Sequence, residues 1–443
     1  MSETLRNDRK TIFGWAMYDW AVSAYSVTLA AILPAFFAEF IVGDDGWNGW
    51  SAETIWSGTV SIGSLALFLA MPILGAIADY GAFKRSFMGF FMLLGVAFTA
   101  AAALVPDRSV PLFTLMVLGS YLAFVASNVF YDGFLTDITT DDTVDHVSSK
   151  GYAYGYVGGG ILLIISLGLL FLSGEESVTG LSTNTAARIA IVLSGLWWIG
   201  FGLYSLSHLH DSGESRPIPS RYAHSSAVRT YIGLGFGRTF ATARKLRYFP
   251  HLMAFIIAYI FYNDGTQTVI SVSGAFASET LDLDLTTITS AFLLVQFVAF
   301  GGALLFGMVS YRMGPKRAIL WCIAIFGVLT GVAYFLPTGQ AIPFYGLAAL
   351  VGLVLGGVQA LSRSLYATMI PVHASAEFFG FFTVFSKFSA IWGPLVYSLV
   401  SHQTGSGRPA VFSLVFFFLI GGVLLARVDV EKARSSRDQW TEA

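Results

Sequence analysis

Five ionisable residues interrupt long apolar stretches of this chain: Asp19, Asp132, Asp264, Arg363 and Lys387. A charged side chain at the centre of a membrane-spanning helix costs about 2.5–3.5 kcal/mol on insertion scales, so such residues face a polar partner or a cavity. Carboxylates and cations placed in this way can bind a polar solute or carry a proton. We therefore treat these five residues as the first candidates for binding and coupling.

Amide side chains accompany most of these charges. Asn128 lies four residues before Asp132, and Gln359 lies four residues before Arg363, so each pair lies on one face of a helix. If the helices line one cavity, three carboxylates and one guanidinium would face each other, and such a cluster suits a small zwitterion. The full set of candidates for substrate binding or coupling is Asp19, Asn128, Asp132, Asn263, Asp264, Gln267, Gln359, Arg363 and Lys387.

The same carboxylates admit other roles. Any of the three could carry a coupling proton, because burial disfavours the charged form and a nearby cation favours it. Asp19 could instead be a structural group bonded to neighbouring helices, and Asp132 could close a salt bridge with Lys387 or Arg363. Asp264 lies deepest in its apolar stretch, so it is the best placed of the three for binding.

The composition shows which elements must carry these residues. The chain is 55% hydrophobic and only 12% charged, whereas soluble proteins have about 25% charged residues. Most of the chain must therefore contact lipid or pack within a membrane. A net charge of −2 gives no basis for nucleic-acid binding. The sequence contains no cluster of metal ligands, no phosphate-binding loop and no nucleophile–base set, so we expect no cofactor, no metal and no enzymatic activity.

Twelve stretches are long and apolar enough to span a bilayer, which takes about 20 residues. The sequence thus predicts an all-α membrane protein with twelve transmembrane helices. The stretches are roughly 12–41, 53–79, 86–105, 111–138, 150–173, 186–207, 249–273, 286–310, 316–336, 342–370, 375–401 and 409–427.

A polar insertion divides these stretches into two sets of six. We expect a six-helix half over residues 1–207, a linker over 208–248, and a second six-helix half with a short tail over 249–443. Placing both termini and the linker in the cytoplasm leaves only three of the 25 Lys and Arg residues in outer loops. Because this asymmetry follows the positive-inside rule, it predicts a multi-pass protein of the cell membrane with cytoplasmic termini.

Within the linker, residues 228–247 have the pattern of a basic amphipathic helix. Val228, Ile232, Phe236 and Phe240 recur every four residues, with Arg and Lys residues between and after them. Such a helix would lie on the inner leaflet and connect the two halves. The alternative is a solvated linker whose cations only follow the positive-inside rule.

The short loop between the second and third stretches carries a different kind of motif. It reads Gly75-Ala-Ile-Ala-Asp79-Tyr-Gly81-Ala-Phe-Lys84-Arg85. A loop of this length can only join two antiparallel helices on one side of the membrane. We interpret Gly75, Asp79, Gly81, Lys84 and Arg85 as a gate or loop lock rather than as a substrate site. A degraded copy in the second half keeps the Lys-Arg pair, which favours two related six-helix repeats.

This loop resembles the signature between helices two and three of the major facilitator superfamily. Other stretches resemble, more specifically, bacterial-type members of the vacuolar amino-acid effluxer family linked to autophagy. The resemblance extends from about residue 12 to 428. It implies a twelve-helix facilitator fold, a place in the bacterial inner membrane and, for the fungal members, export of amino acids from the vacuole. The stretches are Gly14-Trp15-Ala-Met-Tyr18-Asp19-Trp20-Ala, Val129-Phe-Tyr131-Asp132-Gly-Phe-Leu135, Gly155-Tyr-Val-Gly-Gly-Gly160, Phe261-Tyr262-Asn263-Asp264-Gly265, Gln359-Ala-Leu-Ser362-Arg363-Ser364, Glu377-Phe-Phe-Gly380-Phe-Phe and Ser386-Lys387-Phe-Ser389.

Together these features predict a secondary active transporter. It would move a small polar organic solute, with amino acids and peptides as candidates, by rocking two halves around a midplane site. Its partners would be the solute, protons as the candidate coupling ion and the lipid bilayer, and we expect a monomer. One alternative is a carrier of amphiphilic or lipid-like cargo, which cavity-side aromatic residues would suit; the other is a non-transporting membrane sensor. Those aromatic residues are Tyr18, Trp20, Tyr262, Phe382 and Trp392.

The predicted orientation can be tested by labelling cysteines from outside the cell, after replacement of the native Cys322. A cysteine at position 45 or 280 should react with a membrane-impermeant maleimide in intact cells. One at position 220 should react only after permeabilisation, because the Lys and Arg asymmetry places it in the cytoplasm. Labelling of position 220 in intact cells would overturn the orientation.

Overall fold

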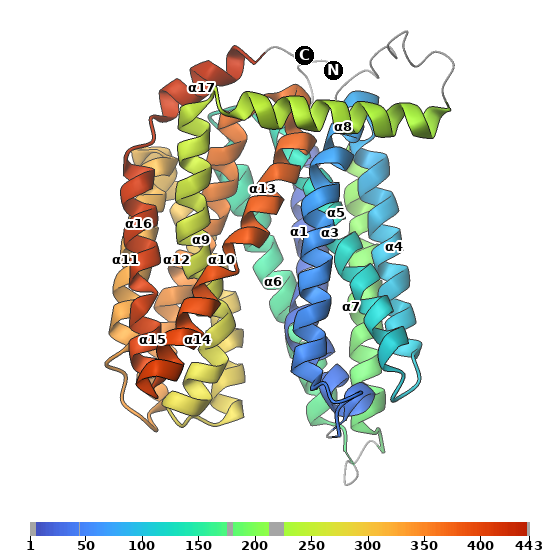
Figure 1. The fold of residues 1–443 in the computed structure, drawn as a ribbon, viewed down its shortest axis with the longest axis vertical. Helices are drawn as coiled ribbons and strands as arrows, with labels where there is room; N and C mark the ends of the chain where they lie inside the picture. The colour runs from blue at the N-terminus through green and yellow to red at the C-terminus, as the bar shows by residue number, and fades with distance from the viewer. Residues whose placement is uncertain (1–5, 44, 175–179, 212–225, 441–443) are drawn as a thin grey trace.

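Long helices run side by side through the whole molecule, as the computed structural model shows (Figure 1). The structure describes residues 6–43, 45–174, 180–211 and 226–440. Both described ends of the chain lie at one end of the bundle, together with the linker helix α8 (Ala227–Leu246). We call this end the terminal side and the opposite end the far side.

The first half contains α1 to α7. Its first span is one 34-residue segment, Arg9–Val42, in which the hydrogen-bond pattern widens to the π form on either side of Pro34. Pro34 has no N–H, so it interrupts the α pattern. The elements are α1 (Arg9–Val27), η2 (Thr28–Ile32), α2 (Leu33–Phe36), η3 (Phe37–Val42), α3 (Ala52–Gly81), α4 (Lys84–Leu104), α5 (Val110–Ile138), α6 (Val144–Phe171) and α7 (Thr183–His208).

The second half follows α8 and ends in a short helix on the terminal side, α17, which lies beyond the last span (Figure 1). Its elements are α9 (Pro250–Ala275), η5 (Phe276–Thr280), α10 (Leu285–Met313), α11 (Pro315–Ala333), α12 (Ala341–Met369), η6 (Val372–Ala374), α13 (Ser375–Ser389), α14 (Trp392–Thr404), α15 (Gly407–Ser413), α16 (Val415–Ala426) and α17 (Val430–Asp438).

Eleven helices among the described residues are long and apolar enough to cross a membrane. The remaining predicted span corresponds to α9, a 26-residue helix that packs against α16 and α13. Asn263, Asp264 and Gln267 lower the hydropathy of α9, which is not among those eleven helices. The least apolar span is therefore the one with the most candidate residues.

Most predicted helix boundaries lie within a few residues of the observed ones. The fifth span shows the largest difference at its start, because it was expected at residue 150 and begins at Val144. Asp145 and Lys150 thus lie inside α6 rather than in the loop before it. The first turns of α6 contain these polar residues, so the helix is longer than its apolar stretch and extends beyond it on the terminal side.

The eleventh span, expected to be continuous over 375–401, is broken. α13 ends at Ser389 and α14 begins at Trp392. Pro394 explains the break, because it lacks an N–H and its ring would clash with the carbonyl of Ala390 in a continuous helix. The span therefore consists of two helices in series.

Glycines allow neighbouring helices to approach closely within each half. An added Cβ at Gly158 of α6 would lie 2.5 Å from the carbonyl oxygen of Trp20 on α1. An added Cβ at Gly356 of α12 would lie 2.7 Å from the backbone nitrogen of Ala303 on α10. Small residues at these positions let the helix backbones touch.

The linker helix α8 has an apolar face that points away from the bundle. Ile232, Phe236 and Phe240 are exposed, while Gly235 packs against α3. The helical prediction for the linker is thus confirmed, although the side chain of Val228 lies outside the described residues. The position of the exposed face on the inner leaflet stays a prediction.

The two halves meet on the terminal side. Figure 1 shows their ribbons converging there and diverging toward the far side. α13 of the second half packs against α3 and α5 of the first, and α6 of the first half packs against α10 and α12 of the second. The side chains that join the halves are therefore found on these helices.

Candidate functional site

A buried guanidinium bridges the two halves. Arg363 of α12 donates from Nη2 to Asp19 Oδ2 (3.0 Å) and from Nη1 to Asp132 Oδ1 (3.1 Å). Its Nε donates to Ser148 Oγ (3.0 Å), and Nη2 also donates to the Ser148 carbonyl (3.0 Å). The Arg363 side chain is only 4% exposed, so these bonds take the place of water. One cation of the second half thus holds α1, α5 and α6 of the first.

Aromatic rings enclose this charge cluster. The Arg363 Cζ atom lies 4.2 Å from the ring centre of Tyr152 and 4.8 Å from that of Trp15. The Tyr131 hydroxyl donates to Asp19 Oδ2 (2.8 Å). The rings exclude water and present their negative faces to the guanidinium. We call Arg363, Asp19 and Asp132 the central ion cluster.

The sequence left open whether Asp132 pairs with Arg363 or with Lys387, and the structure shows the partner. Asp132 pairs with Arg363, as one alternative predicted. Lys387 does not join them, because its Nζ lies 5.3 Å from the ring centre of Tyr121. Asn128 was expected to act with Asp132, but its amide donates to a carbonyl of its own helix (3.0 Å).

A small cavity of about 80 Å³ lies beside the central ion cluster. Its lining is uncharged and consists of hydroxyl, amide and aromatic side chains together with Val358. Tyr152 belongs to both features, since it stacks on Arg363 and lines the cavity. The predicted residues Asn263, Gln267 and Gln359 all face this cavity. The complete lining is Tyr152, Tyr259, Tyr262, Asn263, Thr266, Gln267, Val358, Gln359, Ser362, Phe382 and Ser386.

Hydrogen bonds around the cavity orient its polar groups. The Tyr156 hydroxyl of the first half donates to Gln359 Oε1 (2.5 Å) of the second. The Tyr262 hydroxyl lies 2.8 Å from Ser362 Oγ. These bonds fix the acceptors and donors that a polar solute would meet, and one of them joins the two halves.

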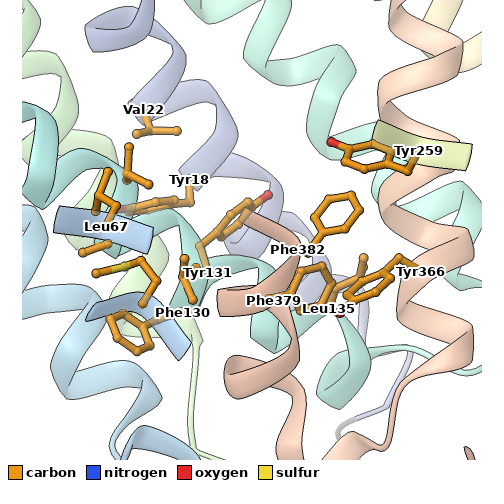
Figure 2. Packing of buried hydrophobic residues seen from close by; sticks show 14 of the residues in the cluster. Tyr18, Val22, Leu67, Phe130, Tyr131, Leu135, Tyr259, Tyr366, Phe379 and Phe382 are labelled. Carbon is orange, nitrogen blue, oxygen red and sulfur yellow. The ribbon is translucent and has the colours of Figure 1, made fainter. Parts of the chain in front are cut away.

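Aromatic residues of α9 and α13 form one wall of the cavity. Phe382 stacks on Tyr259 and Tyr366, with ring centres 4.4 Å and 4.6 Å apart. Figure 2 shows Phe382 and Phe379 between these tyrosines and Tyr131 of the first half. α13 therefore lies between the halves and contributes to the site.

The expectation that five aromatic residues face the cavity is only partly met. Tyr262 and Phe382 line it. Tyr18 instead packs on a neighbouring tyrosine in the core, Trp20 stacks on a tryptophan of α7, and Trp392 is 50% exposed at the start of α14. Aromatic content alone did not indicate which rings face inward.

Asp264 lies apart from the central ion cluster and is absent from the cavity lining. Its Oδ1 accepts the backbone N–H of Gly393 (2.9 Å) in the first turn of α14. The expectation that Asp264 and Arg363 face one cavity is thus not met in this structure. A role of Asp264 in coupling stays a prediction.

The last turns of α3 contact the second half. Asp79 Oδ2 accepts the N–H of Glu377 (2.8 Å), and Oδ1 accepts that of Ala376 (3.2 Å). Both N–H groups belong to the first turn of α13, where the helix dipole favours a carboxylate. An added Cβ at Gly75 would lie 2.6 Å from the Ala376 carbonyl carbon, so this glycine allows α3 and α13 to touch.

Lys84 completes this contact. Its Nζ donates to Asp137 Oδ2 (2.6 Å) and to Ser375 Oγ (3.0 Å), and lies 3.8 Å from Asp79 Oδ1. Ser375 in turn donates to the Gly133 carbonyl (2.9 Å). We call Asp79, Lys84, Asp137 and the first turn of α13 the terminal gate.

The other two predicted gate residues act within the first half. The Arg85 Nε donates to the Leu206 carbonyl (3.0 Å), and its backbone N–H donates to Asp211 Oδ1 (3.0 Å). Burial raises the pKa of Asp211, which lies beyond the end of α7. Gly81 ends α3 and lies under the ring of Phe83. These residues shape the loop that presents Asp79 and Lys84.

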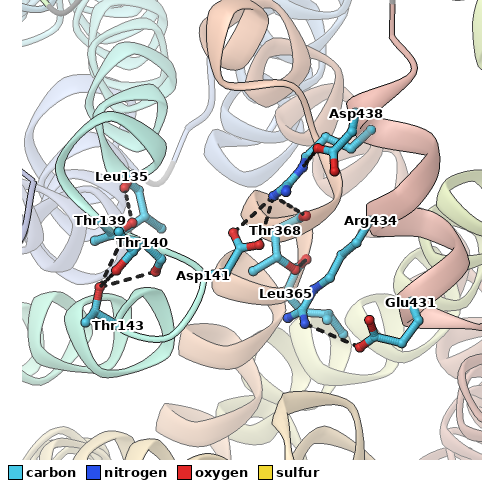
Figure 3. A network of polar contacts seen from close by, with 11 residues as sticks. Leu135, Thr139, Thr140, Asp141, Thr143, Leu365, Thr368, Glu431, Arg434 and Asp438 are labelled. Atoms are coloured by element: carbon cyan, nitrogen blue, oxygen red, sulfur yellow. Dashed lines mark hydrogen bonds and ion pairs between the residues drawn. The ribbon is translucent and has the colours of Figure 1, made fainter. Parts of the chain in front are cut away.

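Two further contacts on the terminal side were not predicted. Arg238 of α8 lies 3.6 Å from Oε2 of the buried Glu377. Arg437 of α17 donates to Asp141 of the first half (3.0 Å) and to the Thr368 carbonyl of the second (3.0 Å). Figure 3 shows Asp141 and Thr368 next to α17. An acid beside two phenylalanines was a usable signal for Glu377, but no pattern marks Arg437.

The fold is that of the major facilitator transporters. The structure matches the major facilitator transporter FucP in its outward conformation over 95% of this chain and 98% of that chain, with a TM-score of 0.69 and 13% identity. It matches the human organic anion transporter MFSD10 over 94% of this chain and 99% of that chain, with a TM-score of 0.70 and 15% identity. These likenesses show that the chain has the major facilitator fold.

Sequence comparisons place the chain in one family among the proteins that share this fold. The family model described as "Vacuole effluxer Atg22 like" matches residues 50–438. The uncharacterized MFS-type transporter YxiO of Bacillus subtilis is 33% identical, over 97% of both chains. This chain belongs to the Atg22-like vacuole effluxer family, which confirms the resemblance found in the sequence. Autophagy-related protein 22-1 of the fungus Phaeosphaeria nodorum is 29% identical, over 65% of this chain and 55% of its own length.

A disulfide across the terminal gate should report its closure. An added Cβ at Gly133 would lie 3.4 Å from the Cβ of Ala376, close to the separation of about 3.5–4.5 Å that disulfides require. Gly133→Cys combined with Ala376→Cys, in a Cys322→Ala background, should cross-link under mild oxidation. Each single cysteine variant is the control. Two reactive thiols that fail to cross-link would contradict the closed gate.

Removing the charge of Arg363 should destabilise the protein, because two carboxylates stay buried without a cation. Arg363→Gln should cost about 3–5 kcal/mol, the range for breaking a buried ion pair, and lower the Tm in detergent. Changing Asp19 and Asp132 to Asn as well should restore most of the loss, whereas Asp132→Asn alone should restore only part. Arg312→Gln on the exposed end of α10 is the matched control. An Arg363→Gln variant as stable as the parent would exclude the bridging role.

Proposed function

We propose that this protein is a secondary active transporter that moves a small polar organic solute across the cytoplasmic membrane by alternating access. One observation carries the proposal. An uncharged polar cavity lies directly beside a buried ion cluster that bridges the two halves. A solute in this cavity touches helices of both halves, so its binding energy can shift their relative position.

The orientation follows from the charge asymmetry of the loops. We infer that the terminal side is cytoplasmic, because the Lys and Arg residues of the loops concentrate there. The structure, with its terminal gate closed, is then an outward-facing conformer. The likeness to FucP in its outward conformation supports this inference.

Amino acids and short peptides are the first solutes to test. The matching family is described as a vacuole effluxer, and hydroxyl and amide groups line a cavity that suits polar groups. The aromatic faces of Tyr259 and Phe382 can accept hydrocarbon or an ammonium group. The volume of about 80 Å³ is far below the roughly 300–1,000 Å³ of pockets for larger ligands. This favours a small solute over a lipid-like cargo.

The central ion cluster supplies a means of proton coupling. It holds two carboxylates but only one guanidinium, so the two acids share a single cation. When the halves separate on the terminal side, Arg363 must leave Asp19 and Asp132. A buried carboxylate that loses its cation favours the protonated form. Opening toward the cytoplasm is thereby linked to proton uptake.

Reconstituted vesicles provide the test. Radiolabelled amino acids and dipeptides that raise the Tm of the purified protein should accumulate in response to an imposed pH gradient, and a protonophore should abolish this accumulation. Asp19→Asn and Asp132→Asn should retain solute exchange but lose gradient-driven accumulation, because one protonatable group is gone. Asp142→Asn, an exposed acid on the same side, is the control.

Two results would count against this proposal. If no amino acid or dipeptide shifts the Tm, the solute class is wrong. If uptake is the same with a pH gradient and with a protonophore, the protein is a facilitator or uses another ion.

A further inference from the structure

We propose that Asn263 and Asp264 are positioning residues that clamp the break in the eleventh span and thereby set the position of α13. The proposal rests on the proposed transport function, because α13 is the helix that closes the terminal gate. It gives Asp264 a role that differs from contact with the solute.

Two adjacent residues of α9 hold the two sides of the break. The Asn263 Nδ2 donates to Ser389 Oγ (2.6 Å), in the last residue of α13. The Asp264 Oδ1 accepts the N–H of Gly393 (2.9 Å), in the first turn of α14. Asn263 is 5% exposed and Asp264 is 1% exposed. One turn of α9 therefore fixes the end of one helix and the beginning of the next.

The break leaves backbone N–H groups at the start of α14 without partners in the helix, and Asp264 accepts one of them. The first N–H groups of a helix have no partner within the helix, and the membrane interior offers no water in their place. A carboxylate at the start of α14 accepts such an N–H and also interacts favourably with the helix dipole. An added Cβ at Gly393 would clash with Thr268 Oγ1 and would lie 2.8 Å from Asp264 Oδ1. The carboxylate thus fits against a glycine.

α13 connects the gate to the cavity as one rigid piece. It has 15 residues, which corresponds to about 22 Å at 1.5 Å per residue. At one end, Ala376 and Glu377 donate to Asp79 in the terminal gate. Phe382, at the middle of the helix, and Ser386, in its last turn, line the cavity. A solute that contacts these two side chains acts on the same helix that closes the gate.

The clamp therefore determines how well α13 docks on the first half. With both bonds in place, the end of α13 at the break is held against α9, and its first turn lies on Asp79. Without them, the break becomes a free joint and α13 can leave the gate. This effect is expected even when no solute is bound.

The rate of disulfide formation in the Gly133→Cys/Ala376→Cys protein measures docking of α13 directly, because the two introduced thiols meet only when the helix is docked. Asp264→Ala and Gly393→Ala should each slow cross-linking by about tenfold or more, the factor expected for losing a hydrogen bond to a charged group. Asp264→Asn should have a smaller effect, because the amide oxygen can still accept the N–H. Gly346→Ala is the matched control, since an added Cβ there meets open space.

The outcome separates a clamp from other roles. Gly393→Ala retains the Asp264 side chain but disturbs its contact with α14. Cross-linking is measured without solute, so a residue that only bound solute would show no defect in this variant. Folding is checked by gel filtration and Tm, and if Asp264→Ala does not fold, Asp264→Asn and Gly393→Ala decide the question. Folded variants that cross-link at the parental rate would overturn the proposal. The assay needs neither solute nor gradient, so failure of the transport proposal would leave its result unchanged.

Discussion

The burial of one guanidinium between two groups of helices is the constraint on which this structure depends. An unpaired charge in the hydrocarbon core is costly, so Arg363 requires Asp19 and Asp132 whenever it is away from water. Those carboxylates belong to the other half of the molecule. The closed terminal side is the arrangement in which all three charges have partners. Any opening on that side must provide new ones, and water, a proton or a solute can do so.

Further contacts between and within the halves involve the two ends of α13. Asp79 accepts N–H groups at the start of that helix, and Lys84 neutralises the acids around it. At its other end the helix stops where Pro394 prevents continuation, and α9 holds both sides of the break. Between these ends the helix packs on the second half through Phe382, which stacks on Tyr259 and Tyr366. The cavity and the terminal gate therefore share one helix, α13.

The sequence predicted much of the fold, and the reasons differ from feature to feature. Long apolar runs located the spans, and charges within them indicated that Asp19, Asp132 and Arg363 needed partners. The break in the eleventh span was missed, although Pro394 is visible in the sequence, because membrane helices often tolerate proline. The partner of Asp264 could not be predicted, since it is a backbone N–H and carries no residue-type signal.

The most direct test is the distance between the halves on each side of the membrane. Spin labels at Ser207 and Arg312 report the terminal side, and labels at Gly49 and Gly339 report the far side. Changing Asp19 and Asp132 to Asn together with Arg363→Gln removes the charges that hold the halves together. We expect the terminal distance to lengthen and the far-side distance to shorten in pulsed dipolar measurements. Unchanged distances on both sides would contradict the view that the central ion cluster holds the outward-facing state.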